Sequence, residues 1–108
     1  MSRLPVQDDE CAAMLRVLGD ATRLKVVQQL FRGTRRVGEL NEVIEVEQSL
    51  LSHHLRVLRD AGIVEAQRDG KGVLYQLAPA VEKRRRGQVL NLGCCRLTFD
   101  QHTSERDS

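Results

Sequence analysis

The sequence predicts a mainly α fold with one small β-hairpin (α+β), formed by a single domain over residues 7–99. Apolar residues recur at helical spacing up to Gly62, whereas "IVEAQRDGKGVLYQL" (63–77) contains two alternating runs around a Gly-containing loop. Aromatic residues make up only 3% of the chain, so the core must be built from Leu, Val, Ile and Ala. The predicted order is four helices, a two-stranded ribbon and a last helix.

The first two helices are predicted from apolar stripes and from residues typical of helix ends. The first begins at Gln7 and stops at Gly19, and its stripe consists of Cys11, Met14, Leu15 and Leu18. Asp20 caps the second helix, "ATRLKVVQQLFR", which ends at Gly33. The residues of the second helix expected to face inward are Leu24, Val27, Leu30 and Phe31.

The remaining elements follow from similar signals. "VGELNEVI" (37–44) predicts a short third helix, and "EQSLLSHHLRVLRDAG" predicts a fourth that starts near Glu47 and stops at Gly62. Pro79 can open a last helix that carries Val81 and the basic run 83–86. Residues 88–99 fit neither the helical nor the extended period. Residues 1–6 and 100–108 are expected to be flexible termini.

The fourth helix has two faces of opposite character. Leu51, Leu55 and Leu58 are expected to pack inward, while the opposite stripe carries only hydrogen-bonding side chains: Ser49, Ser52, His53 and Arg56. Small hydroxyl side chains permit close approach to a duplex, and Arg can pair with guanine through two hydrogen bonds. This face therefore suits the DNA major groove, although an exposed helix without a partner would show the same pattern in isolation.

The context of this helix favours DNA. A short helix, a turn and the fourth helix make a helix-turn-helix, and the hairpin that follows makes a wing. The wing loop offers Arg68 and Lys71 to a phosphate backbone or minor groove. The net charge of the whole chain is only +2, but its basic residues gather in the second half. Such an asymmetry is compatible with a nucleic-acid face.

Three segments together resemble the ArsR/SmtB family of winged-helix repressors: "LRVLGDATRLKVVQQL", "VGEL" and "QSLLSHHLRVLRDAGIVEAQRDGKGVLYQL". The resemblance runs from about Cys11 to Leu77. It implies a homodimer formed through the first and last helices, bound to an inverted-repeat operator in double-stranded DNA and released by a metal, metalloid or oxidant. On matching positions it implies groove-reading residues Gln48, Ser49, Ser52, His53 and Arg56, with wing contacts at Arg68 and Lys71.

Two positions depart from the family pattern. Glu47 stands where a capping Ser is usual, and Glu accepts the cap hydrogen bond poorly, so the start of the helix can shift. Leu50 replaces a more usual Thr or Pro; it is a candidate contact to a thymine methyl group, or it packs within the protein. Both departures leave the operator sequence open.

The usual metal sites of the resembling family are missing or incomplete. Many members place sensing cysteines in the third helix, but "ELNEVIEVEQ" has none. Others bind zinc through Asp and His of the last helix; here Asp100, His102 and Glu105 lack a second pair of ligands. His53 and His54 are neighbours that point about 100° apart, which disfavours a shared ion.

The cysteines are the remaining sensor candidates. Cys11 lies on the stripe of the first helix, and the adjacent pair Cys94 and Cys95 follows the last helix, so the thiols are expected to converge, with Cys11 of one subunit meeting the pair of the other. Three thiolates suit As(III) or Sb(III), which are soft and carry a lone pair, whereas zinc would require a fourth ligand. No cofactor is obligatory; the metalloid is the expected inducer.

Other roles for these cysteines remain open. A redox or persulfide switch would use a Cys11–Cys94 or Cys11–Cys95 bond, and Cd(II), Pb(II) or Cu(I) are alternative soft ligands. Cys11 can also be simple core packing. In each sensing case, ligand and operator oppose one another through a coupling free energy of about 1–3 kcal/mol.

The sequence does not favour an enzyme. The chain has no Cys-x-x-Cys with its βαβ context, no catalytic Ser/His/Asp set and no phosphate-binding loop. A winged helix that binds protein rather than DNA is the other alternative, and salt-dependent binding to duplex DNA discriminates the two. No stretch has the length of a signal peptide or a membrane span, so the expected location is the cytoplasm, where thiols are kept reduced.

Overall fold

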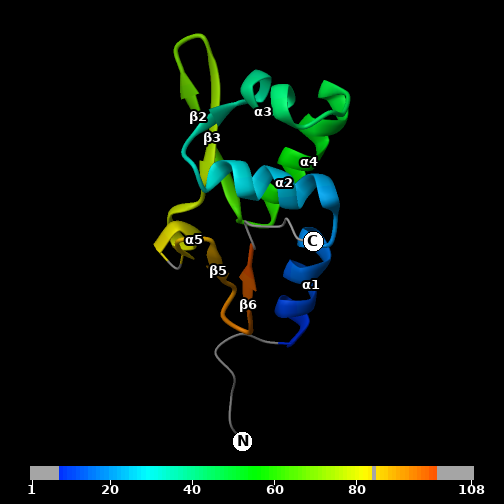
Figure 1. Ribbon diagram of the computed structural model, residues 1–108, viewed down its shortest axis with the longest axis vertical. Coiled ribbons are helices and arrows are strands. Elements are labelled where there is room, and N and C mark those ends of the chain that lie inside the picture. The colour runs from blue at the N-terminus through cyan, green and yellow to red at the C-terminus, as the bar shows by residue number, and fades with distance from the viewer. Residues whose placement is uncertain (1–7, 84, 100–108) are drawn as a thin grey trace, which may run out of the picture.

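The computed structural model describes residues 8–83 and 85–99. The predicted termini 1–6 and 100–108 lie outside the described residues, as do Gln7 and the tail residues considered for zinc, so these predictions and the domain limits stay predictions. Figure 1 shows how the helices and strands are arranged. The helices are α1 (Asp8–Leu18), α2 (Ala21–Leu30), α3 (Val37–Val43), α4 (Gln48–Asp60) and α5 (Pro79–Lys83). The strands are β1 (Arg35–Arg36), β2 (Val64–Asp69), β3 (Gly72–Leu77), β4 (Arg85–Arg86), β5 (Val89–Asn91) and β6 (Arg96–Thr98).

Helix α2 starts where the sequence predicts. The side chain of Asp20 accepts hydrogen bonds from the backbone N–H groups of Thr22 and Arg23 at 2.8 and 3.1 Å, which satisfies donors that a helix start leaves free. The helix ends before Gly33, whose φ of 136° is strained for any residue with a Cβ. Helix α2 contributes Val26, Val27 and Leu30 to the core, while Leu24 packs against it partly buried.

Helices α3 and α4 form the predicted helix-turn-helix. Leu40 of α3 and Leu51, Leu55 and Leu58 of α4 are completely buried. This apolar face fixes how α4 rotates about its own axis, because turning it would expose all of these leucines together. The other face of α4 is thereby left toward solvent.

The hairpin β2–β3 confirms the predicted wing. Its register runs from Val64 opposite Leu77 to Asp69 opposite Gly72, and Gly70 takes a positive φ of 55° in the connecting loop. A short strand was not expected on the other side: Arg35 pairs with Tyr75 and Arg36 with Leu74. The sheet order is therefore β1-β3-β2. The wing is attached in this way to the start of α3.

The C-terminal segment differs from the predicted last helix. Helix α5 ends at Lys83, and Arg85 and Arg86 form β4, so the prediction that the last helix carries the whole basic run is wrong. The physical reason is burial. Leu90, Leu92 and Phe99 reach the core when β4, β5 and β6 form an antiparallel sheet, and Gly87 turns the chain at a φ of 60°. Residues 88–99, undecided from sequence, are mainly extended.

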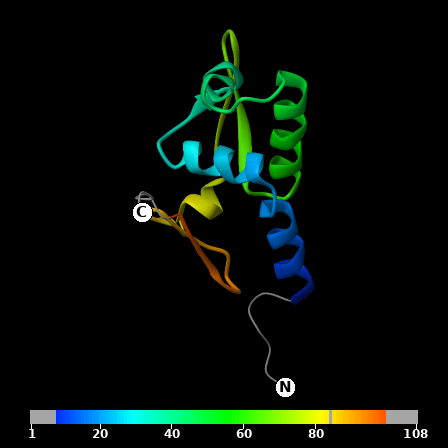
Figure 2. The same ribbon diagram turned by 45° about the vertical axis from the view of Figure 1, so that its right-hand side comes forward.

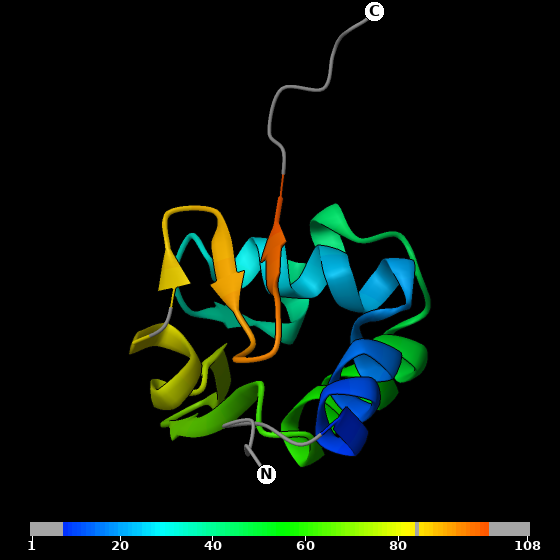
Figure 3. The same ribbon diagram turned by 90° about the horizontal axis from the view of Figure 1, so that it is seen from below.

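The apolar stripe of α1 is divided between the core and the surface of the single chain. Leu18 is buried and Met14 packs against the core, but Leu15 is 46% exposed. Val17 lies partly buried against the core, whereas Leu15 is left on the surface, on the helix through which the dimer is expected to form. In Figure 2, α1 lies below α2 and α4, and the C-terminal strands lie to the left of α1. Figure 3 shows the C-terminal sheet and α1 from below.

Candidate DNA-binding surface and thiol cluster

The exposed face of α4 carries all the side chains predicted to read the groove. These residues are exposed: Gln48, Ser49, Leu50, Ser52, His53 and Arg56. Leu50 is 45% exposed, so it does not pack within this chain and remains available for an apolar contact. Within the described residues, none of these six side chains forms an ion pair or a side-chain hydrogen bond, which leaves their polar groups free for a ligand.

The start of α4 follows the expectation for Glu47. Glu47 occupies the N-cap position, but its side chain makes no capping hydrogen bond. Its backbone carbonyl accepts from the N–H of Leu51 at 2.9 Å, so the helix begins without side-chain help. The N–H groups of the first turn therefore lack the usual side-chain partner.

The wing presents the two predicted cations. Arg68 on β2 and Lys71 in the loop are both exposed. Arg36 was missed by the sequence reasoning: it forms an ion pair with Asp69 at the end of β2, and its own backbone N–H is bound by Glu39 at 2.8 Å. The pair of adjacent arginines before "VGEL" was the available signal. Arg36 thus connects the wing tip with the first turn of α3.

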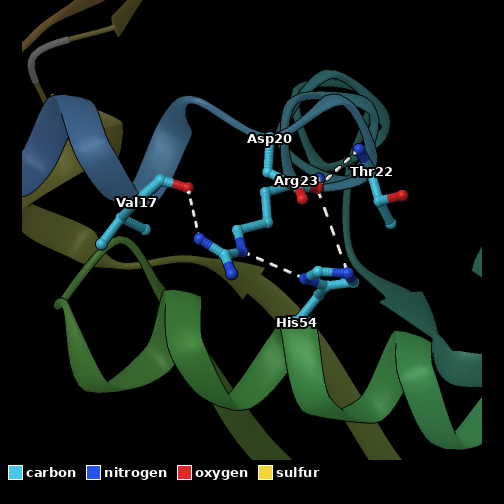
Figure 4. A network of polar contacts seen from close by, with 5 residues as sticks. All are labelled: Val17, Asp20, Thr22, Arg23 and His54. Carbon is cyan, nitrogen blue, oxygen red and sulfur yellow. Dashed lines mark hydrogen bonds and ion pairs between the residues drawn. The ribbon is translucent and has the colours of Figure 1, made fainter.

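Behind the candidate DNA face, His54 lies in the protein interior at 7% exposure, as expected for an imidazole at the edge of the core. Its Nδ1 accepts a hydrogen bond from Nε of Arg23 at 3.0 Å, and its Nε2 lies 4.0 Å from Oδ1 of Asp20 (Figure 4). Burial lowers the pKa of His54, which outweighs the opposing attraction of the Asp20 carboxylate. Neutral His54 with an acceptor at Nδ1 is consistent with this arrangement.

Asp20 is held in its ionised form by the helix that it caps. The hydrogen bond from the backbone N–H of Arg23 is the largest cause that lowers the pKa of Asp20; partial burial opposes it, and His54 and the Thr22 N–H add to it. Asp20 therefore links the N-terminus of α2 to the imidazole of α4.

The three cysteines come together at the start of α1. A disulfide joins Cys11 of α1 to Cys94 of the β5–β6 turn, with Cα atoms 6.1 Å apart, inside the range that a disulfide requires. Cys95 is a free, exposed thiol with its Sγ 3.9 Å from that of Cys94. All three sulfur atoms lie within 4.8 Å of one another. The expected convergence is present.

The convergence differs from the expectation in one respect. The sequence predicts that Cys11 meets the cysteine pair of the partner subunit, whereas the structure brings all three sulfur atoms together within one chain. The reason is the C-terminal sheet: its β5–β6 turn folds back beside the start of α1 (Figure 1). In the described part of the chain, this is the one cluster of three or more His, Cys, Asp or Glu side chains that lie close enough to share a metal ion. His53 and His54 are not part of it.

The candidate DNA surface and the thiol cluster lie at opposite ends of the molecule. In Figures 1 and 2 the start of α4 and the tip of the β2–β3 hairpin lie at the top, while the start of α1 and the β5–β6 turn lie at the bottom. A ligand at the thiols cannot touch DNA held by α4. Any effect of one on the other must pass through the protein.

Fold, surface and cluster together define a winged helix-turn-helix regulator. The family model "Bacterial regulatory protein, arsR family" matches residues 20–66, from the Asp20 cap through α4 to the start of β2. The crystal structure of the transcriptional repressor BigR from Xylella fastidiosa is similar with a TM-score of 0.62 and 42% identity, covering 67% of this chain and 74% of that one. The chain belongs to the ArsR family.

Two further relatives are informative. The HTH-type transcriptional repressor SmtB of Mycobacterium tuberculosis is 41% identical over 70 residues, which is 65% of this chain and 52% of the relative. The homodimeric winged helix-turn-helix DNA-binding domain of Mb0332 from Mycobacterium bovis has a TM-score of 0.62 at 25% identity, covering 72% of this chain and 78% of that one. The chain spans about half the length of the SmtB relative.

The part of the chain that the family model matches does not include the cysteines. Residues 20–66 contain Gln48 to Arg56, whereas Cys11, Cys94 and Cys95 all lie outside. Family membership therefore says little about the inducer, which must be argued from the thiol cluster. Among residues 8–83 and 85–99, no helix combines the length and the apolar character needed to cross a bilayer.

Proposed function

We propose that this protein is a transcriptional repressor that binds operator DNA as a homodimer and releases it when As(III) or Sb(III) binds Cys11, Cys94 and Cys95. The DNA-binding half of the proposal is supported by the exposed polar face of α4 beside an exposed basic wing. With Arg56 on that face and with Arg68 and Lys71 on the wing, the surface offers both base-reading and phosphate-contacting groups. An inverted-repeat operator follows from two-fold symmetry of the dimer.

The homodimer is supported by α1. Leu15 is 46% exposed on a helix whose other face packs against the core, and a second copy of α1 would cover it. Helix α5 has only five residues, so the C-terminal sheet would take the place that a last helix occupies in the expected dimer. The proposal places the protein in the cytoplasm, with its DNA and with reduced thiols.

The observation that carries the sensing half is the approach of three sulfur atoms to within 4.8 Å of one another. In the reduced protein, arsenous acid would exchange its three hydroxyl groups for three cysteine sulfurs and release three water molecules. The product is a pyramidal centre that needs no fourth ligand, and soft thiolates are the donors that such an ion prefers. The cluster joins α1 to the β5–β6 turn, so ligation would change the position of α1 relative to that turn.

A second candidate is a redox switch, favoured by the Cys11–Cys94 disulfide. Oxidation of these two thiols by hydrogen peroxide would form the S–S bond and reduce the peroxide to two water molecules. The free thiol of Cys95, 3.9 Å from the Cys94 sulfur, could then exchange with the disulfide. Oxidation removes two of the three metalloid donors, so the two signals exclude one another. Cd(II), Pb(II) and Cu(I) are alternative ligands of the reduced cluster.

The decisive experiment measures operator binding of the reduced protein under anaerobic conditions. A DNA site is first selected from a random duplex library, and its affinity is then measured by fluorescence anisotropy with increasing arsenite. We expect release of the wild type, and no release of single Ser variants at Cys11, Cys94 or Cys95, because Ser keeps the size but lacks the soft donor. The matched control is the triple Ser variant, which should bind the operator as well as the reduced wild type.

Each half of the proposal can fail separately. Binding to duplex DNA that does not weaken steeply with salt would remove the DNA-binding half. Equal operator affinity with and without arsenite would remove the metalloid, and release by peroxide alone would favour the redox switch instead. Release of the Cys11→Ser variant by arsenite would return Cys11 to a packing role.

A further inference from the structure

The separation of the two sites raises the question of how they communicate. The thiol cluster involves the start of α1, and the groove-reading side chains belong to the far face of α4. The inference below rests on the proposed function, since it concerns how a ligand at the thiols would act on the recognition helix α4. It requires a physical connection between α1 and α4.

Arg23 makes that connection with a single guanidinium group. Its NH1 donates to the backbone carbonyl of Val17, in the last turn of α1, at 3.0 Å. Its Nε donates to Nδ1 of His54, in the middle of α4, at 3.0 Å. Figure 4 shows the Arg23 side chain extending from α2 between the end of α1 and the imidazole of α4. Both contacts are partly buried.

The α1 side of this connection is tied to the thiols. Val17 and Cys11 belong to the same helix, Asp8–Leu18, so a displacement of the helix at Cys11 moves the Val17 carbonyl as well. Helix α1 ends at Leu18, and Gly19 separates it from the Asp20 cap. The hydrogen bond from Arg23 to the Val17 carbonyl spans this junction.

The α4 side of the connection is tied to the DNA face. His54 is 7% exposed and directly follows His53, which lies on the exposed face. A buried imidazole that loses its partner must find another or move, because an unsatisfied polar group in the interior is costly. Asp20 stands 4.0 Å away on the other side of the ring and limits where the imidazole can go.

We propose that Arg23 is the positioning residue that couples the thiol cluster to the recognition helix. Ligation of Cys11, Cys94 and Cys95 shifts α1, the Val17 carbonyl moves relative to Arg23, and the guanidinium no longer holds both Val17 and His54. Helix α4 then loses the orientation in which Ser52, His53 and Arg56 enter the groove. The coupling is reciprocal: operator DNA weakens arsenite binding by the same factor by which arsenite weakens operator binding.

The test is the ratio of operator dissociation constants with and without saturating arsenite, measured on reduced protein. We expect a ratio of about ten to one hundred for the wild type, corresponding to the usual range of coupling. In Arg23→Gln the ratio should fall to within about twofold of one, while arsenite still protects the thiols from alkylation. The matched control is Lys25→Gln, which removes an exposed cation from the same helix and should keep the wild-type ratio.

The ratio separates coupling from a merely structural role. If Arg23 only stabilised the fold, Arg23→Gln would weaken operator binding by the same factor in both states and leave the ratio unchanged, and this result would overturn the inference. A wild-type ratio of one would overturn the inference together with the sensing half of the proposed function. If the wild type responds to arsenite and Arg23→Gln shows the same ratio, the inference is overturned but the proposed function is not.

Two further measurements cover a variant that does not fold. Arg23→Lys keeps the charge but has one nitrogen, which cannot hold Val17 and His54 as the guanidinium does, and its ratio should also fall. In ¹⁵N-labelled wild type, the Nδ1 resonance of His54 should shift on addition of arsenite because its hydrogen bond changes. An unchanged Nδ1 resonance in protein that has bound arsenite would contradict the proposed movement.

Discussion

The ring of Phe99 packs edge-on against the ring of Phe31, with centroids 5.3 Å apart and planes at 85°. This contact joins the C-terminal sheet to the end of α2, two parts of the chain that the sequence does not relate. Arg85 lies over the same Phe31 ring with its guanidinium carbon 5.0 Å from the centroid. The sheet is therefore part of the core rather than an appendage.

Removal of the Phe99 ring should destabilise the whole domain. Phe99 is 7% exposed, and Phe99→Ala would leave a cavity beside Phe31, so we expect a loss of about 3 kcal/mol in the free energy of unfolding. Urea unfolding followed by circular dichroism measures this loss. The exposed neighbour is the control: Thr98→Ala should change the stability by less than about 0.5 kcal/mol. Equal stabilities of the two variants would mean that the sheet does not belong to the core.

The disulfide should stabilise the oxidised protein strongly. Cys11 and Cys94 are 83 residues apart, and closing a loop of that size raises the free energy of the unfolded chain by about 4.5 kcal/mol. We expect reduction to lower the free energy of unfolding of the wild type and of Cys95→Ser to a similar degree. Cys94→Ser should be insensitive to the reductant. Unfolding that is the same with and without reductant in the wild type would show that this disulfide does not form in solution.

Protonation of His54 should weaken the fold below neutral pH. Its pKa is lowered, with burial as the main cause, while the Arg23 and His53 charges act in the same direction and Asp20 opposes them. A depressed histidine pKa means that the neutral form is favoured by folding. The stability is therefore fully present above the ordinary value of 6.5 and is lost as the pH falls through the lowered pKa of the folded state.

The pH dependence of the free energy of unfolding checks this expectation. We expect a decline in the wild type below pH 6.5 that is smaller in His54→Gln, which does not titrate in that range. His53→Gln is the control, since its side chain is exposed and its loss should leave the decline in place. Identical pH profiles of wild type and His54→Gln would contradict the depressed pKa.

The two kinds of DNA contact should respond differently to mutation. Arg56→Ala on α4 should cost about 1–3 kcal/mol on the selected site and relax its sequence preference, because a bidentate contact to a base is lost. Lys71→Ala at the wing should weaken binding to all sequences and reduce the salt slope by about one. Arg16→Ala is the control: Arg16 is exposed on α1 away from this surface, so its loss should leave operator binding unchanged. A salt slope that Lys71→Ala leaves unchanged would remove the wing from the interface.

The helix-turn-helix and wing could be predicted because their signals are local. The leucines at 51, 55 and 58 recur at the helical period, so the opposite face with Ser52 and Arg56 had to be exposed. Asp20 caps α2 through its own neighbours, Thr22 and Arg23. In each case the determining contacts span a few residues, so the sequence contains them in readable order.

The C-terminal sheet could not be predicted, since its pattern is irregular and its contacts are distant. Phe99 is buried by Phe31, and Leu90 and Leu92 reach the core only when three very short strands pair. Helical and extended periods were both poor fits over this segment, and short strands leave little periodic signal. The helical prediction for Arg85 and Arg86 failed for the same reason.

By itself the sequence determined a winged helix-turn-helix with a polar α4 face and three candidate thiols, because residue spacing along a helix or hairpin fixes which side chains share a face. Only the tertiary structure decided that Cys11 meets Cys94 within one chain, that Arg23 joins Val17 to His54, and that the thiols lie far from the DNA face. These contacts depend on how separate elements pack against a common core. Packing is set by the combined burial of many side chains, which no local pattern encodes.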